Sequence, residues 1–178
     1  MNSSDEATLV TERLWKMQII QGAIVAGALI YAIVAFVLRQ SGAMKGHAEQ
    51  PIVSYVMSAF AIMALIQFPI MTRRIVKENR RKMAGGVPST ASTEAKSTSD
   101  TAELLASFQT SMIVGAAIVE GATFGLIVAF LLDATSWTLI GAIALSAVNA
   151  LQFPTRTRLE RWLDEQRELI QQERAGVE

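Results

Sequence analysis

The residue with the clearest chemical potential is Glu120, a carboxylic acid in the middle of a long apolar run. That run extends from Met112 to Leu132 and contains no other ionisable group. At about 1.5 Å per residue it spans roughly 32 Å, which matches the hydrocarbon core of a bilayer. A charged group at that depth costs at least about 2.5 kcal/mol, so an acid there calls for a function or a partner.

The partners expected for Glu120 are polar but uncharged. No Lys, Arg or His occurs in any of the four apolar runs of the chain, so we expect an uncharged carboxyl that forms hydrogen bonds. Counting by depth gives the candidate partners Ser58, Thr123, Ser146 and Asn149. Two interpretations stay open: a proton- or cation-binding carboxyl, and a neutral contact between helices worth about 1 kcal/mol.

Small residues lie next to this acid. Gly121 and Gly125 form a GxxxG motif directly after it, Gly115 lies shortly before it, and Gly22 and Gly27 give an earlier run a similar surface. Such surfaces let helix backbones approach closely. We predict helix packing within the chain, with contact between copies of the chain as the alternative.

A basic segment follows the second apolar run. It contains Arg73, Arg74, Lys77, Arg80, Arg81 and Lys82. Near a membrane surface each charge attracts anionic lipid headgroups by about 1 kcal/mol, which predicts a headgroup-binding segment. The alternative is that these residues only set the orientation of the chain in the membrane.

The apolar runs that must position these residues dominate the composition. The chain is 51% hydrophobic and 18% charged, against about 25% charged in an average soluble domain. The runs predict spans at about 17–38, 52–71, 112–132 and 137–153. The predicted fold is therefore an all-α integral membrane four-helix bundle whose partner is the lipid bilayer.

The distribution of basic residues predicts the orientation. Arg39 and Lys45 lie between the first two runs and no basic residue lies between the last two, while the other Lys and Arg residues lie in the N-terminal, middle and C-terminal segments. The positive-inside rule then places both termini in the cytoplasm, with the chain in the plasma (bacterial inner) membrane. Trp15, Trp162, Tyr55 and Trp137 lie near the ends of the runs, as interfacial aromatic residues do.

An internal repeat divides the chain. Residues 22–38 match residues 116–132 at more than half of their positions, and Gln-Phe-Pro recurs at residues 67 and 152. We predict two tandem parallel helical hairpins with amphipathic cytoplasmic extensions, in units 1–83 and 100–178, joined by a flexible linker at 84–99. Pro69 and Pro154 are expected to kink or restart the helix.

Motifs of most enzyme classes are missing from the sequence. There is no cysteine, P-loop, dinucleotide-binding glycine motif, metal-ligand cluster or plausible catalytic triad. We therefore expect no catalytic residue, no metal, no cofactor and no nucleic-acid partner. The predicted role is a non-enzymatic scaffold or accessory subunit that binds itself or another membrane protein, and the alternative is a proton- or cation-conducting protein that uses Glu120.

Two resemblances rest on short motifs. With GAAIVEGA at 115–122 and QFPTRTRLERWL at 152–163, the whole chain resembles uncharacterised small bacterial four-helix membrane proteins, which implies the architecture and no activity. VEGATFGLIVAFLL at 119–132 is similar to the carboxylate-bearing helix of rotary ATPase proteolipid subunits, which implies an ion site at Glu120. In that family, however, the acid lies in the second helix of the hairpin, and here it lies in the first.

Overall fold

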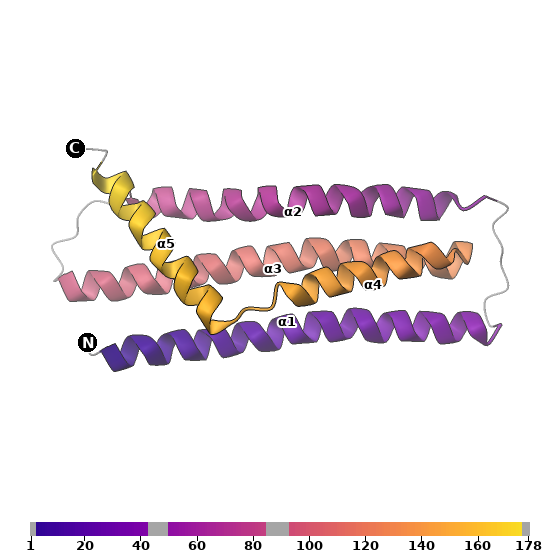
Figure 1. Cartoon of the computed structure of the whole chain (residues 1–178), viewed down its shortest axis with the longest axis horizontal. Coiled ribbons are helices and arrows are strands. Elements are labelled where there is room, and N and C mark those ends of the chain that lie inside the picture. Colours follow the sequence, from indigo (N-terminus) through magenta and orange to yellow (C-terminus); the bar gives the residue numbers. More distant parts are fainter. Residues whose placement is uncertain (1–2, 43–49, 85–92, 176–178) are drawn as a thin grey trace. The chain divides into compact units, whose positions relative to one another are not determined.

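In the part of the chain that the structure describes, all regular secondary structure is helical. The computed structural model describes residues 3–42, 50–84 and 93–175, and every regular element in these ranges is an α-helix (Figure 1). The helices are α1 (Ser3–Gln40), α2 (Ile52–Ala84), α3 (Thr93–Asp133), α4 (Ser136–Leu151) and α5 (Arg156–Ala175). The all-α prediction is confirmed.

Three of these helices are long and apolar enough to cross a membrane. The qualifying segments are Ala7–Gln40, Ile52–Met83 and Thr101–Asp133. With 16 residues, α4 is about 24 Å long, shorter than the roughly 30 Å of a bilayer core. It qualifies as a fourth candidate only together with α5, across the break that separates them.

The helices contribute to two compact units, each with its own core. Unit 2 comprises Ile20–Ile70 and Val114–Phe153. Its core is built largely from alanines of α1, α2 and α4 that pack against larger side chains of α3. Because alanine lets helix backbones approach closely, a sequence with few large residues at these positions can still pack densely. The core residues are Ala32, Ala35, Ala61, Ala64, Val119, Ala122, Leu126, Ile127, Phe130, Leu131, Ala142 and Leu145.

Unit 2 leaves much apolar surface uncovered on its outer helices. In the most apolar window of each helix, 50% of the residues of α3 are buried, against 22% in α1 and 17% in α2. Ile30, Ile33, Ile62 and Ile140 are each more than half exposed. Soluble proteins seldom leave such continuous apolar surface open to water, so these faces are compatible with a membrane environment.

Unit 1 comprises the described residues of 1–19, 71–113 and 154–178. Its core joins leucines of α1, α3 and α5 with Met83 of α2, and Phe108 packs against Trp162 with ring centroids 5.0 Å apart. The Gln18 side chain donates a hydrogen bond of 3.0 Å to the Pro154 carbonyl. α5 belongs to this unit because its Leu159, Leu163 and Ile170 recur on one face and are buried in the core.

The linker predicted at 84–99 is shorter than expected. Ala84 is the last residue of α2, and α3 begins at Thr93, so the last seven residues of the predicted linker belong to a helix. Glu94 and Ala95 favour a helix, and the serines and threonines around them do not prevent it. Residues 85–92 of the linker lie outside the described residues.

The two Gln-Phe-Pro sequences have different outcomes. At Pro154 the helix stops and restarts as predicted, whereas α2 continues through Pro69 without interruption, so the predicted restart there is wrong. The residue after each proline explains the difference. Thr155 accepts a hydrogen bond from the Arg158 N–H at 3.4 Å and so caps α5, whereas the corresponding Ile70 has no side-chain acceptor with which to begin a new helix.

Candidate functional site

Glu120 stands apart from its predicted partners. Its side chain is half-buried in unit 2, and no hydrogen bond or ion pair joins it to another residue of the described ranges. The Thr123 hydroxyl donates instead to the Val119 carbonyl at 2.9 Å, and the Ser146 hydroxyl donates to the Ala142 carbonyl at 3.0 Å. Both hydroxyls therefore satisfy carbonyls of their own helix, four residues back.

Asn149 pairs with a residue that the sequence reasoning missed. The Gln21 side-chain amide donates to Asn149 Oδ1 at 2.7 Å and to the Asn149 carbonyl at 3.0 Å. Both side chains are buried, and the bonds join α1 to α4. The signal was present, because Gln21 is one of the few polar residues in the first apolar run.

Two buried oxygens in unit 2 have no hydrogen-bond partner. They are Oε1 of Gln21 and Oγ of Ser58. An unsatisfied buried acceptor or hydroxyl costs about 1–3 kcal/mol, so such atoms usually mark places where a further polar group or a water can bind. Together with Glu120, they are polar groups of this unit that could accept a ligand.

A second polar cluster joins the ends of three helices. Asp133, at the end of α3, accepts a hydrogen bond of 2.6 Å from the N–H of Ser54, which is in the first turn of α2. The Ser54 hydroxyl also bonds to the Thr135 hydroxyl, and the Thr138 hydroxyl donates to the Thr135 carbonyl at 2.6 Å. The first turn of α2 contains no acidic residue of its own. Asp133 of α3 therefore caps the N-terminus of α2 with a carboxylate.

The glycines predicted for helix packing have different surroundings. Gly125 lies against α2, where a Cβ atom would be 2.9 Å from Sδ of Met57. Gly115 is buried. At Gly22, Gly27 and Gly121 a Cβ would meet no atom within 4 Å, so these three leave open space on α1 and α3.

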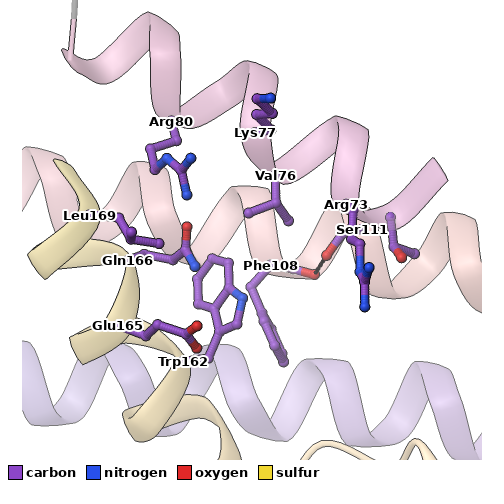
Figure 2. Close-up of a pocket in the computed structure, with 11 residues that line it drawn as sticks. Arg73, Val76, Lys77, Arg80, Phe108, Ser111, Trp162, Glu165, Gln166 and Leu169 are labelled. Carbon is purple, nitrogen blue, oxygen red and sulfur yellow. Dashed lines mark hydrogen bonds between the residues drawn. The ribbon is translucent and has the colours of Figure 1, made fainter. Parts of the chain in front are cut away.

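The basic residues of α2 border a groove in unit 1. Figure 2 shows side chains of α2, α3 and α5 around it, and its volume is about 420 Å³. Arg73, Lys77 and Arg80 line it, whereas Arg74, Arg81 and Lys82 do not. The other lining residues are Thr72, Val76, Phe108, Ser111, Trp162, Glu165, Gln166 and Leu169.

The charges around this groove are only partly neutralised. Nε of Arg80 forms an ion pair of 2.8 Å with Glu173, whose side chain is 32% exposed. Outside the groove, Lys82 pairs with Glu78, which lowers the pKa of that carboxyl from its usual 4.5, chiefly through the hydrogen bond between them. No ion pair or hydrogen bond joins Arg73 or Lys77 to another described residue, so both charges are available.

The described ranges offer no metal site: no group of three or more His, Cys, Asp or Glu side chains comes together in residues 3–42, 50–84 or 93–175. Comparison of the chain with known protein families, with curated proteins and with solved structures finds no match. The chemistry must therefore be inferred from the polar groups of unit 2 and from the groove of unit 1.

Proposed function

We propose that this chain is a non-enzymatic membrane scaffold or accessory subunit, built as a four-span bundle of two tandem hairpins. The observation that carries the proposal is the exposed apolar surface of α1 and α2, which the chain does not cover. A lipid bilayer is the environment that would cover it. Both termini and the middle connection are proposed to be cytoplasmic, as the basic residues indicate.

The division into two units supports this topology. Described residues from the N-terminal, middle and C-terminal segments, which carry most of the basic residues, all belong to unit 1. Among the residues that the structure describes, unit 2 holds one basic residue, Arg39. At one end of unit 2, Tyr55 and Trp137 lie with ring centroids 6.1 Å apart and are both exposed, as expected of aromatic residues at a membrane interface.

Self-association is the proposed mode of action. Gly121 is exposed on α3, and Ala117, one turn earlier, is exposed on the same helical face. With open space at Gly121, Gly22 and Gly27, the helix backbones of a second copy could approach closely. The scaffold would thus act by holding copies of itself, or another membrane protein, through these surfaces.

Fluorescence energy transfer between labelled copies in liposomes tests this proposal. Gly121→Leu fills the open surface and is expected to weaken association by about tenfold, equivalent to about 1.4 kcal/mol. Ala59→Leu is the matched control, because it enlarges an exposed small residue on α2 away from these glycines. Equal association of wild type and Gly121→Leu would contradict the proposal.

A second candidate function, proton or cation conduction, has one observation in its favour. In unit 2, Oγ of Ser58 is buried without a hydrogen-bond partner, and no hydrogen bond or ion pair joins Glu120 to another described residue, so both could bind an ion or a proton carrier. The engagement of Thr123, Ser146 and Asn149 in other bonds weakens this candidate. A flux into liposomes, reported by an enclosed pH-sensitive dye and abolished in Glu120→Gln, would favour conduction over the scaffold.

A further inference from the structure

The groove of unit 1 combines three chemical characters in one place. Its α2 wall is cationic, with Arg73, Lys77 and Arg80 at successive turns of one helix face. Facing it, α5 supplies the aromatic Trp162 and two acceptors, Glu165 and Gln166 (Figure 2). A ligand that fits must therefore carry negative charge, hydrogen-bond donors and an apolar part.

The negative charge would be held by two cations without protein partners. Arg73 and Lys77 are exposed at the mouth of the groove and form no ion pair with described residues. Arg80 is already paired with Glu173 and so supplies less free charge. Guanidinium and ammonium groups separated by one helical turn suit a phosphodiester, because Arg binds its oxygens in a fixed geometry and Lys adds a point charge.

Donors on the ligand would satisfy an orphan acceptor. Gln166 is only 5% exposed, and its Oε1 is buried without a hydrogen-bond partner. Leaving such an atom unpaired is unfavourable, and a hydroxyl group entering the groove would pair with it. The neighbouring carboxylate of Glu165 accepts hydrogen bonds in the same way.

Some residues that line the groove lie next to the apolar runs in the sequence. Thr72 and Arg73 follow the second apolar run directly, and Ser111 immediately precedes the third. Phe108, Val76 and Leu169 give the groove an apolar lining. In a chain that spans a membrane as proposed above, this region is at headgroup depth, where one molecule can offer a phosphodiester to the cations and hydrocarbon to the spans.

We propose that this groove binds the headgroup of a phospholipid whose phosphodiester carries a hydroxylated substituent, as in phosphatidylglycerol. Arg73 and Lys77 bind the phosphodiester, Gln166 and Glu165 accept hydrogen bonds from the headgroup hydroxyls, and Trp162 covers the glycerol backbone. The volume of about 420 Å³ lies within the roughly 300–1,000 Å³ of small-molecule sites. The inference rests on the proposed membrane location.

Native mass spectrometry of the full chain in detergent measures the binding. We expect phosphatidylglycerol to bind at least tenfold more tightly than phosphatidylcholine. The double variant Arg73→Gln/Lys77→Gln should lose that preference. The matched control is Arg74→Gln/Arg81→Gln, which removes two exposed charges from the same helix outside the groove and should keep it. Equal losses in both double variants would overturn the site in favour of diffuse surface charge.

The role of Gln166 is tested with phosphatidylmethanol, which has the same charge as phosphatidylglycerol and no headgroup hydroxyl. Wild type should prefer phosphatidylglycerol, and Gln166→Leu should remove that preference while retaining helicity by circular dichroism. Equal binding of the two lipids by wild type would overturn the hydroxyl contact. Equal binding of phosphatidylethanolamine would overturn the headgroup class, and full competition by soluble glycerol 3-phosphate would overturn a lipid as the ligand.

Failure of the membrane location is detected separately, by extracting membranes with alkaline carbonate. A chain released by carbonate contradicts the proposed spanning fold whatever its headgroup preference. A chain that resists extraction and does not discriminate headgroups overturns this inference alone.

Discussion

Removing the carboxylate of Asp133 should destabilise the protein measurably. Its Oδ2 accepts the N–H of Ser54 at 2.6 Å, the side chain is 7% exposed, and Ser54 is fully buried. A hydrogen bond to a charged acceptor contributes about 1.5–3 kcal/mol, and a negative charge at a helix N-terminus adds about 0.3–1 kcal/mol. Because water cannot easily replace the lost acceptor, Asp133→Ala should lower the free energy of unfolding by about 2–4 kcal/mol.

Unfolding in detergent micelles with increasing dodecyl sulfate, followed by circular dichroism, measures this change. The control is Asp164→Ala, which removes an aspartate whose side chain is 76% exposed and which lies 3.8 Å from Arg167. Exposed pairs of this kind contribute about 0–1 kcal/mol, so the control should unfold almost as wild type does. Similar small losses in both variants would refute the view that Asp133 caps α2.

Three further predictions each concern a single residue. Gly125→Leu should lower the free energy of unfolding by about 1–3 kcal/mol in the same micelle assay, because a leucine side chain would have to displace Met57, whose Sδ would already be 2.9 Å from the added Cβ. Ala134 has a φ of 58°, so Ala134→Gly should raise that free energy by about 1 kcal/mol. The pKa of Glu12 is lowered from 4.5 by its hydrogen bond to Lys16, so any stability from this exposed pair is present above that pH and lost as the pH falls. In an NMR titration, Lys16→Met should return the pKa of Glu12 toward 4.5.

The helices could be predicted from the sequence because apolar runs and their lengths carry a one-dimensional signal. The hydrogen-bond partners of the polar residues could not be predicted in this way. Counting depth placed Ser146 nearly level with Glu120 and Asn149 one turn nearer the cytoplasm, but it does not say which way each side chain points around its helix. In the structure Ser146 bonds to its own backbone and Asn149 to Gln21, which is 128 residues away in the sequence. The direction in which a side chain points around its helix is decided by tertiary packing, and a count of depth along the helix carries no information about that packing.

The Asp133 cap and the groove could not be predicted from the sequence either, because both depend on tertiary packing. Asp133 caps a helix that begins 81 residues before it, in the first turn around Ser54, and a search for caps within the same helix cannot find it. Arg73 and Lys77 were predicted to bind headgroups. Gln166 was not, because the sequence predicted only an amphipathic helix for the segment that contains it. Its unpaired oxygen is visible only once α5 packs beside α2.

The two repeated segments of the chain differ at the residue that follows the proline of Gln-Phe-Pro. Where the first copy continues past its proline with Ile70, the second has Thr155 and begins a separate helix, which then provides Trp162 and Gln166. The first copy has no counterpart to that helix. The stoichiometry expected at saturation is therefore one selected lipid per polypeptide and not two, although the Gln-Phe-Pro sequence occurs twice.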